Sequence, residues 1–531
     1  MKWPNRRKWI HQVLGAGGVD MYSATVPGAV PGLDLGLNHD LVRDGGAPLY
    51  RQIAAAIRTC ILAGTLTPGV KLPSSRELAK RLEVHRRTVV AAYQVLERES
   101  LIYSGVGQGT FVGERLDRPD DETRGLFSWE AFLRRPEGPA DLWRFVGREG
   151  TAPGAIRFTG ATADPALFPT DDFRGVLDDA FRLYGSGALE YGPTEGYAPL
   201  REWVAERLRD RGVRVDPDEV MIVSGSQQGL DLAARLLLHD GDAVMVEEPG
   251  YPNGFRVFQA AGARAVGVPL DDGGLRLDLL ERVARRDGPR LLYTMPIFQN
   301  PTGLSLAEDR IGPLLDLCGR LGMPVIEDQF DADLFYEGPL PRSLKAADDR
   351  GMVLLLGSFS KILFPGLRLG WLVVPRPLLA ALHELKQMTD FSSGLLVQCA
   401  MDLYCRRGLL DRHLDRVRAI YGVRLSVMLR ALDEEFPPEV RWTRPRGGLT
   451  LWVSLPAGLD ALDLWAQARR EGVDFTPGPV FFPSGGGNGH FRLSYIRETE
   501  ERIQSGIARL GALVRANLAR GAAPSAAGPF I

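Results

Sequence analysis

Apolar positions repeat with helical spacing early in the chain and form strand-length runs later. Leu49, Ile53, Ile57 and Ile61 lie four residues apart, which predicts a helix with one apolar face. From about residue 155, short apolar runs alternate with segments of helical period; the runs cover residues 220–223, 243–246, 291–293, 325–326, 353–356 and 371–374. This alternation predicts an α/β fold around a largely parallel sheet.

Two more helices and a hairpin are predicted after the first helix. Residues 74–77 form a capping box that begins a second helix, and a third helix carries Arg86, Arg87 and Thr88 in its first turn. Two helices linked in this way place the second one in the major groove of DNA. Residues 101–112 contain two apolar runs separated by glycines, which predicts a β-hairpin wing. Taken singly, the arginines could belong to an ordinary solvated helix face.

Charge is distributed unevenly along the chain. The whole sequence has 64 Lys and Arg against 66 Asp and Glu, a net charge of −2. Residues 48–113 alone carry +5, so the remainder carries −7. A compact basic segment joined to an acidic bulk suggests that one part of the protein meets a polyanion and the other does not.

The basic segment resembles the winged helix-turn-helix of the GntR-family regulators. The resemblance rests on residues 48–53, 72–78, 86–89 and 107–112 and spans the whole segment. It implies contacts with phosphates and base edges from the second and third helices, and contacts with the minor groove from the tip of the wing. The DNA-binding residues implied in this way are Arg76, Arg86, Arg87, Thr88, Gln108 and Gly109.

A lysine motif follows one of the predicted strands of the larger part. Residues 358–361 read Ser-Phe-Ser-Lys directly after the run 353–356, and Arg368 lies seven residues beyond Lys361. The carboxyl ends of parallel strands form the usual ligand edge of a sheet. A lysine there can form a Schiff base with an aldehyde cofactor, while Ser358 and Arg368 can bind a phosphate. Considered alone, a lysine at a strand end is more often simply solvated.

Four other predicted strand ends supply complementary groups. Residues 224–229 follow a strand and open a helix, which makes either an anion site or an ordinary helix cap. Tyr251 can stack on a planar ring, Asn300 can donate to a ring oxygen, and Asp328 can keep a pyridine nitrogen protonated. Together with Lys361, these groups are the set that an electron-sink cofactor requires.

In this order the set resembles the fold-type I aminotransferases that bind pyridoxal 5′-phosphate, from about residue 155 to the end of the chain. The resemblance implies a large α/β domain with a mostly parallel sheet and a smaller C-terminal α+β part. It implies that Lys361 forms the internal aldimine, with Asp328 on the pyridine nitrogen, Asn300 on the ring oxygen and Tyr251 on the ring face. The phosphate would be bound by Gly225, Ser226, Gln227, Ser358 and Arg368.

Three further residues follow from the same resemblance. Tyr191 would reach the phosphate of the partner subunit in a head-to-tail homodimer. Arg492 would clamp a carboxylate of the bound small molecule. Phe330 stands where related regulators usually have a tyrosine that hydrogen-bonds the ring oxygen, a departure that weakens a full catalytic cycle more than it weakens cofactor binding.

A DNA-reading wing and an aminotransferase-like body on one chain resemble the MocR/GabR regulators. The division expected is a flexible extension over residues 1–47, a winged helix-turn-helix over 48–113, a linker over 114–154 and a cofactor-binding and dimerisation domain over 155–531. The resemblance implies a transcription regulator in which an amine or amino-acid effector reacts at the Lys361 aldimine and changes the affinity for operator DNA. Two alternatives remain: a working aminotransferase with a vestigial DNA domain, and a dimerisation scaffold without a cofactor.

Composition limits the classes of protein to which the chain can belong. Apolar residues make up 45% of the chain and charged residues 24%, as in ordinary globular proteins, and 531 residues are enough for two or more domains. No apolar run reaches the 18 or so residues of a membrane span. The four cysteines lack metal-binding spacing, which predicts reduced thiols in a cytoplasmic protein without a metal site.

Overall fold

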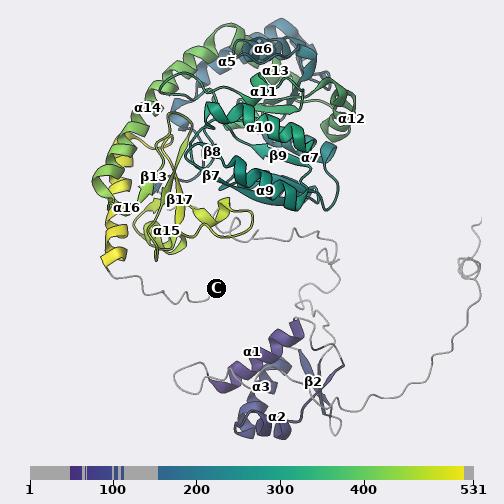
Figure 1. Cartoon of the computed structure of the whole chain (residues 1–531), viewed down its shortest axis with the longest axis vertical. Helices are drawn as coiled ribbons and strands as arrows, with labels where there is room; N and C mark the ends of the chain where they lie inside the picture. Colours follow the sequence, from purple (N-terminus) through teal and green to yellow (C-terminus); the bar gives the residue numbers. More distant parts are fainter. Residues whose placement is uncertain are drawn as a thin grey trace, which may run out of the picture. The chain divides into compact units, whose positions relative to one another are not determined.

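The computed structural model describes residues 48–62, 66, 69–98, 101–105, 109–112 and 154–519. These residues belong to two compact units, one ending at Leu133 and the other beginning at Arg134. The extension expected over residues 1–47, nearly all of the expected linker, and Gln108 lie outside the described residues. Each unit is described by itself below, with element labels as in Figure 1.

The first unit is a three-helix domain with a small sheet. Its elements are α1 (Leu49–Leu62), β1 (Lys71–Leu72), α2 (Ser75–Arg81), α3 (Arg86–Arg98), β2 (Ile102–Gly105) and β3 (Gly109–Val112). The antiparallel strands follow the order β1-β3-β2. The predicted helix and the predicted hairpin are therefore confirmed, and the architecture is a winged helix-turn-helix.

Apolar faces of the three helices meet in one core. Ile53 and Ile57 from α1 pack with Leu78 from α2 and with Val89 and Leu96 from α3, all buried. The helix starts follow the sequence signals, since the Ser74 side chain accepts a hydrogen bond from the backbone N–H of Glu77 at 3.2 Å. The short turn between α2 and α3 leaves the first turn of α3 at the surface.

The second unit is built on an eight-stranded sheet with the order β5-β12-β11-β10-β9-β6-β7-β8. Strands β7, β6, β9, β10 and β11 are parallel, whereas β12 is antiparallel to both of its neighbours and β8 is antiparallel to β7. The strands are β5 (Val220–Val223), β6 (Ala243–Glu248), β7 (Arg264–Asp271), β8 (Gly274–Leu275), β9 (Leu291–Thr294), β10 (Val325–Gln329), β11 (Val353–Ser358) and β12 (Gly370–Val373).

The strand directions bring five chain segments to one edge. Because β12 runs antiparallel to both β5 and β11, those two strands point the same way, and β5, β6, β9, β10 and β11 all end at this carboxyl edge. Strand β12 begins at the same edge, where Gly370 pairs with both Ser358 and Val223. The mostly parallel sheet expected from the alternating pattern is thus confirmed.

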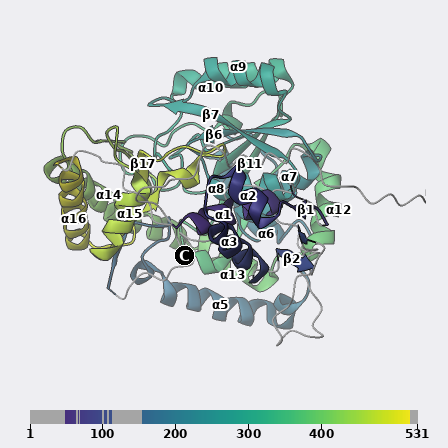
Figure 2. The same ribbon diagram turned by 90° about the horizontal axis from the view of Figure 1, so that it is seen from below.

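Helices cover both faces of this sheet, so consecutive residues of its central strands are buried. Val244 and Leu291 pack on the side of α7 (Ser226–Leu237) and α8 (Pro252–Ala260). Met245 and Leu292, the next residues along the strands, pack with helices α9 and α10. Figure 2 shows α9 and α10 together above β6 and β7. The other helices of the layers are α5 (Thr170–Tyr184), α6 (Ala198–Arg209), α9 (Leu277–Asp287), α10 (Glu308–Leu321), α11 (Leu344–Ala347), α12 (Leu379–Asp390) and α13 (Leu395–Arg406).

A smaller α+β part completes the unit. Its antiparallel sheet has the order β13-β14-β17-β16, and β15 pairs with β4. The long helices α14 and α16 lie side by side along it (Figure 1). Its elements are β4 (Ile156–Arg157), α14 (Leu409–Glu435), β13 (Arg441–Trp442), β14 (Thr450–Ser454), α15 (Ala461–Arg470), β15 (Val473–Asp474), β16 (Thr476–Pro477), β17 (His490–Ser494) and α16 (Glu500–Ala519). Among the described residues, no helix is long and apolar enough to cross a membrane.

A buried tyrosine links α3 to the turn before α2. The Tyr93 hydroxyl donates to the carbonyl oxygen of Pro73 at 2.7 Å, and burial raises the pKa of this phenol. We expect Tyr93→Phe to reduce the stability of the first unit by about 1 kcal/mol, because the Pro73 carbonyl loses its donor. Tyr103→Phe is the control, since that side chain is 53% exposed. Hydrogen exchange of the α3 amides in the full chain measures the effect, and equal protection in the two variants would contradict it.

Candidate functional site

The carboxyl edge of the large sheet gathers the residues that the sequence singled out. Ser224 and Gly225 follow β5, Tyr251 follows β6, Asn300 lies in the loop after β9, Asp328 is in β10, and Lys361 follows β11. Their charges act on one another: the charges of Asp328, Arg492 and Arg368 reach the Tyr251 phenol, and those of Arg492 and Arg368 reach the Lys361 amine.

One corner of this edge is built to bind an anion. Gly225 adopts a φ of +86° and precedes α7, whose first residues are Ser226 and Gln227. A Cβ at Gly225 would lie 2.9 Å from Nη2 of Arg368, which itself donates to the Ser224 carbonyl oxygen at 2.8 Å. The amides of a first helical turn have no carbonyl partner within the helix, so they and the guanidinium face the same small space.

Two serines, one at the end of β11 and one just after it, extend this corner. Ser358 is buried, and its hydroxyl oxygen accepts from the backbone N–H of Ser360 at 3.1 Å. The hydroxyl of Ser360 is itself buried without a hydrogen-bond partner. Sequence reasoning selected Ser358 and missed Ser360, although both belong to the Ser-x-Ser-Lys motif. An orphaned hydroxyl beside a cationic corner is suited to donate to a phosphate oxygen.

Only one oxygen of the Asp328 carboxylate has a hydrogen-bond partner. Its Oδ2 accepts from the Tyr293 hydroxyl at 2.8 Å, whereas its Oδ1 is buried without a partner. Burial raises the pKa of this carboxyl to about 7, against the opposing effect of the Tyr293 hydrogen bond, and the buried Glu247 charge adds to the rise. A cationic N–H donor placed at Oδ1 would stabilise the ionised form. The sequence did not point to Tyr293, because a tyrosine inside a buried strand is ordinarily interpreted as a core residue.

Arg492 orients the amide of Asn300. Its Nη1 donates to Asn300 Oδ1 at 2.9 Å and its Nη2 donates to the Thr476 hydroxyl at 3.2 Å. The guanidinium also lies 5.0 Å from the centre of the Phe481 ring, and burial lowers the pKa of Arg492 to about 10. With its oxygen occupied, Asn300 presents its NH₂ group as a donor. The Nε of Arg492 is buried without a partner and can donate to an anionic ligand.

Lys361 is held ready to act as a nucleophile. Burial lowers the pKa of its amine to about 8, the positive charges of Arg492 and Arg368 lower it further, and Asp331 opposes them. At that pKa about one amine in ten is uncharged at pH 7, several hundred times the fraction of a solvated lysine. Lys345 and Lys386, the other lysines in the described part of this unit, form ion pairs with Asp348 and Asp390.

Residues 327–331 contain three acidic side chains with different roles. The two oxygens of Glu327 are fully engaged by the Ser343 hydroxyl, the Gln329 amide and the backbone N–H groups of Leu344 and Lys345. Asp331 is 1% exposed, and both of its oxygens are buried without a partner. The sequence did not single it out. The side chain of Phe330, between Asp328 and Asp331, is buried in the apolar core and offers no polar atom to the site.

Tyr191 is not brought to these residues within the chain. It lies between η4 (Gly185–Leu189) and α6, its side chain is 85% exposed, and its ring is 6.0 Å from that of Phe391.

The residues predicted to bind DNA lie on the first unit. Arg76, Arg86 and Arg87 are exposed, Thr88 is half-buried, and Arg86 Nε donates to the Ser75 hydroxyl at 3.3 Å. Gly109 has a φ of +114° and lies against the Lys71 side chain. The second and third helices thus share one exposed basic edge, and the position of Gln108 is not described.

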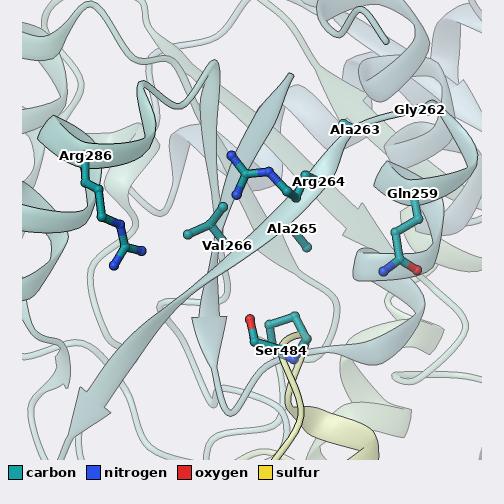
Figure 3. A pocket seen from close by; sticks show the side chains of 9 residues that line it. Gln259, Gly262, Ala263, Arg264, Ala265, Val266, Arg286 and Ser484 are labelled. Atoms are coloured by element: carbon teal, nitrogen blue, oxygen red, sulfur yellow. The ribbon is translucent and has the colours of Figure 1, made fainter. Parts of the chain in front are cut away.

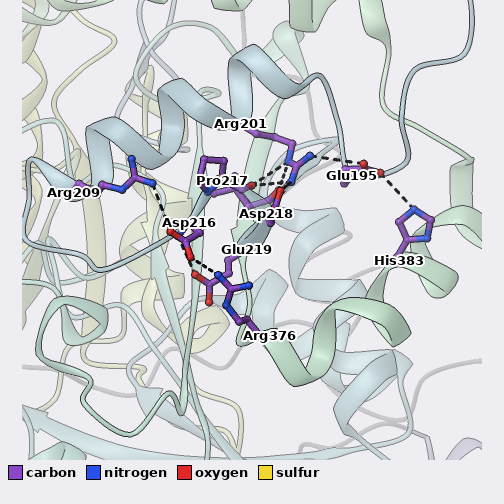
Figure 4. A network of polar contacts seen from close by, with 10 residues as sticks. Glu195, Arg201, Arg209, Asp216, Pro217, Asp218, Glu219, Arg376 and His383 are labelled. Atoms are coloured by element: carbon purple, nitrogen blue, oxygen red, sulfur yellow. Dashed lines mark hydrogen bonds and ion pairs between the residues drawn. The ribbon is translucent and has the colours of Figure 1, made fainter.

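A buried arginine with carbonyl and carboxylate partners fixes the entry to strand β5 (Figure 4). Arg201 of α6 donates to the carbonyl oxygens of Val220 and Pro217, each at 2.9 Å, and pairs with Asp218 at 3.2 Å. It also lies 3.7 Å from Glu195, which faces His383 of α12 at 3.4 Å. Since Ser224 and Gly225 follow this strand, the network holds the anion corner in place.

A separate cavity of about 540 Å³ lies away from these residues (Figure 3). Its lining includes Arg264 and Arg286, both of which pair with Asp287, at 3.5 and 2.8 Å. None of the residues gathered at the carboxyl edge lines it.

The carboxyl edge fits pyridoxal 5′-phosphate group by group. The anion corner with the Ser360 hydroxyl matches the phosphate, the free Oδ1 of Asp328 matches a protonated ring nitrogen, and the Asn300 amide matches the ring oxygen. Lys361 supplies the amine that such an aldehyde requires. Each of these protein groups otherwise lacks a full set of partners, which is the condition that a bound polar ligand relieves.

Comparison with known proteins gives two family matches. Residues 169–510 match the family "Aminotransferase class I and II", and residues 49–112 match "Bacterial regulatory proteins, gntR family". The 2-aminoadipate transaminase of Thermus thermophilus is 41% identical over 69% of this chain and 92% of its own length. The probable rhizopine catabolism regulatory protein MocR of Rhizobium meliloti is 31% identical over 82% of this chain and 88% of its own.

A solved structure resembles the second unit. The α-aminoadipate aminotransferase LysN from Thermus thermophilus, complexed with N-(5′-phosphopyridoxyl)-L-leucine, has a TM-score of 0.68 and 37% identity. The match covers 74% of this chain and all of that one.

The raised pKa of Asp328 predicts a pH-dependent cost to folding. Between about pH 4 and pH 7 the folded carboxyl keeps a proton that the unfolded one loses, so stability falls as the pH rises and the full cost is present above pH 7. Asp328→Asn should therefore stabilise the cofactor-free protein at pH 8 by about 2–4 kcal/mol, and change it little at pH 4. Thermal unfolding at the two pH values measures this.

Asp278→Asn serves as the control for this test. The pKa of Asp278 is lowered to about 2 by its hydrogen bond with Arg276, so removing its charge should bring no gain at pH 8. Equal stability of wild-type protein and Asp328→Asn at pH 8 would contradict the cost assigned to the buried carboxyl.

Proposed function

The chain belongs to the class I and II aminotransferase family and carries a gntR-family DNA-binding segment, and we propose that it is a MocR-type transcription regulator that senses an amine through pyridoxal 5′-phosphate. One observation carries the proposal: two features occur on the same chain. One is a helix with exposed basic residues in its first turn. The other is a lysine whose pKa is lowered to about 8, in a site with unpartnered polar groups that match those of the cofactor.

The first unit binds operator DNA in this proposal. Arg86, Arg87 and Thr88 in the first turn of α3 read the major groove, and Arg76 on α2 contacts the phosphate backbone. Gly109 and the neighbouring Gln108 approach the minor groove from the wing, where a glycine permits close contact. Because regulators of this kind act on chromosomal DNA, we place the protein in the cytoplasm.

The second unit binds the cofactor. When bound, pyridoxal phosphate supplies an aldehyde carbon on which amines can replace one another, with a ring that withdraws electrons from that carbon. Lys361 holds this carbon, and Asp328 keeps the ring nitrogen protonated. Tyr251 covers the ring face, and Asn300 donates to the ring oxygen. Gly225, Ser226, Gln227, Ser358 and Arg368 bind the phosphate, and Ser360 joins them.

The effector is an amine or amino acid that displaces Lys361 from the cofactor. Arg492 binds a carboxylate when the effector has one, since its buried guanidinium retains an unpartnered Nε. Binding of the effector in place of Lys361 changes the affinity for operator DNA. The size of that change is limited by the difference between the effector's affinities for the two arrangements of the chain.

The protein works as a homodimer in this proposal. The exposed Tyr191 reaches the cofactor phosphate of the partner subunit in a head-to-tail arrangement. We assign residues 48–113 to DNA binding and 155–531 to cofactor binding, sensing and dimerisation. Residues 114–154 form the linker between them, and residues 1–47 form an extension.

A second candidate function is a working aminotransferase whose DNA-binding unit is vestigial. The 41% identity to a 2-aminoadipate transaminase favours this candidate. The apolar Phe330 beside Asp328 disfavours it, because the site lacks a phenol there to tune the cofactor. Sustained turnover of an amino acid with 2-oxoglutarate would support the enzyme, and a single half-reaction without turnover would support the regulator.

Lys361→Ala tests the cofactor link. We expect the purified wild-type protein with pyridoxal phosphate to show a visible absorbance band and to be trapped covalently by borohydride, and the variant to lose both. Lys345→Ala is the matched control, because that lysine pairs with Asp348 at 3.5 Å and lies outside the site. A variant at Lys361 that still traps the cofactor covalently would contradict the role of this amine.

Arg86→Ala tests the DNA-binding face. We expect operator affinity to fall by at least tenfold in a mobility-shift assay on the promoter region of the gene itself, while the cofactor absorbance stays unchanged. Arg81→Ala is the control, since Arg81 pairs with Glu77 at 2.9 Å on the neighbouring helix. Normal operator binding by Arg86→Ala would remove α3 from its recognition role.

A further inference from the structure

Asp331 is a buried carboxylate for which the site provides no donor. It follows β10, is 1% exposed, and neither Oδ1 nor Oδ2 has a hydrogen-bond partner. A carboxylate removed from water in this way is costly unless a cation or several donors compensate it. The side chain therefore has unused capacity to bind a ligand.

The tyrosine hydroxyls near Asp331 already donate their protons to other acceptors. The titratable groups facing Asp331 are Asp328, Lys361, Tyr336 and Tyr495. The Tyr336 hydroxyl donates to the carbonyl oxygen of Gly448, and the Tyr495 hydroxyl donates to that of Gly447 at 3.0 Å. A phenol has one proton to donate, so neither tyrosine can donate a hydrogen bond to the Asp331 carboxylate.

The loop holds Asp331 in this position. The N–H of Leu334 donates to the Asp331 carbonyl oxygen at 2.8 Å, and Asp333 is paired with Arg207 at 2.8 Å and with Arg211. On the other side, a Cβ on Gly448 would lie 3.4 Å from Asp331 Oδ2, so the glycine backbone closes off that approach. These contacts hold the backbone of residues 331–334 in place.

The cofactor does not use this group either. Under the proposed function its phosphate, ring nitrogen, ring oxygen and aldehyde carbon are matched by the α7 corner, Asp328, Asn300 and Lys361. Asp331 is left beside Lys361, the position that an incoming amine must approach. Amines reach a protein at neutral pH as ammonium ions, which are cationic donors but are not nucleophiles.

We propose that Asp331 binds the ammonium group of the effector and accepts its proton, so that the ligand recognised is a protonated primary amine. The inference rests on the proposed function and deepens it. One N–H bond of the ammonium breaks and one O–H bond forms on Asp331, which frees the nitrogen lone pair. The effector nitrogen would then replace the Lys361 nitrogen on the cofactor carbon, with its two remaining N–H hydrogens passing to the Lys361 nitrogen as the bonds to carbon are exchanged. The released Lys361 amine would take the third proton from Asp331.

The electrostatics of the site agree with this role. Burial raises the pKa of Asp331 well above its usual range, with the Asp328 charge adding to the rise and Lys361 opposing it. A cation beside a carboxylate favours its ionised form, so the ammonium group of the effector counteracts the effect of burial and leaves a carboxylate that can accept the proton. It is suited to hold the effector proton until Lys361 needs it.

Asp331→Asn in the full chain tests the proposal, with methylamine and L-alanine as probes. The variant should keep the visible absorbance band and borohydride trapping, while the second-order rate constant of amine exchange, followed by stopped-flow absorbance, falls about 100-fold at pH 7. In the variant the rate should rise tenfold per pH unit below the amine's pKa, because only free amine reacts. The wild-type rate should depend less steeply on pH.

A second measurement needs no cofactor. Removing the Asp331 charge should lower the pKa of Lys361 further, so the pH midpoint for reductive methylation of Lys361 in the cofactor-free protein should fall in Asp331→Asn. Asp331→Glu keeps a carboxylate and should restore the shallow pH profile of exchange. Asp349→Asn, an exposed aspartate paired with Arg214, is the control and should leave both measurements unchanged.

The outcomes separate the two proposals. A coloured Asp331→Asn protein with the exchange rate and pH profile of wild type would overturn the role of Asp331 and leave the proposed function standing. Loss of the absorbance band in Asp331→Asn would also overturn it, since the side chain would then serve the cofactor. A colourless wild-type protein would overturn the proposed function and this inference with it.

Discussion

Charged groups removed from water without full partners dominate the carboxyl edge of the large sheet. Burial raises the pKa of Asp328 to about 7 and lowers that of Lys361 to about 8. A folded protein tolerates such groups when something else compensates them, and here the compensating partner has to come from a ligand. The chemistry of the site follows, because a cationic ring nitrogen and an aldehyde are the two groups that would relieve these two residues.

The surrounding structure keeps this unfavourable arrangement in place. Arg201 fixes the entry to β5, Glu327 is fully hydrogen-bonded behind Asp328, and Asp333 ties the loop after β10 to Arg207 and Arg211. Both oxygens of Glu327 are hydrogen-bonded, whereas Asp328 keeps one oxygen and Asp331 both oxygens without a partner. Stability is thus concentrated in the residues next to the site, while the site itself keeps the orphaned atoms that a ligand needs.

Joining this site to a DNA-binding unit gives its chemistry a regulatory use. An enzyme must release its product and begin again, but a sensor only needs the bound state to differ from the free state. The apolar Phe330 and the unpaired Asp331 suit the second task, since the one removes a tuning hydroxyl and the other offers an ammonium site. In the proposed function, operator affinity is the readout of an amine exchange at Lys361.

Much of the fold could be predicted from the pattern of the chain. The apolar run at 220–223 coincides with β5, and the helix predicted from Leu49 to Ile61 is α1. The Ser-x-Ser-Lys motif lies at the end of a strand as expected, with Ser358 as the last residue of β11. Local periodicity and capping signals act over a few residues, so sequence carries them directly. Strand β7 and the edge strand β8 were not anticipated, because β7 carries polar and small residues among its apolar ones.

The sequence by itself therefore determined the two kinds of domain, the lysine and the strand ends that surround it. Only the tertiary structure decided how many hydrogen bonds each carboxylate accepts: both oxygens of Glu327 have partners, one oxygen of Asp328 has a partner, and Asp331 has none. It also decided that Tyr293 and Ser360 belong to the site. All three carboxylates look alike in sequence. Their pKa values and roles depend on burial, on the donors of residues 343–345, and on the carbonyl oxygens of residues 447–448, which accept the protons of the tyrosines near Asp331. These contacts join distant segments, and no local pattern encodes them.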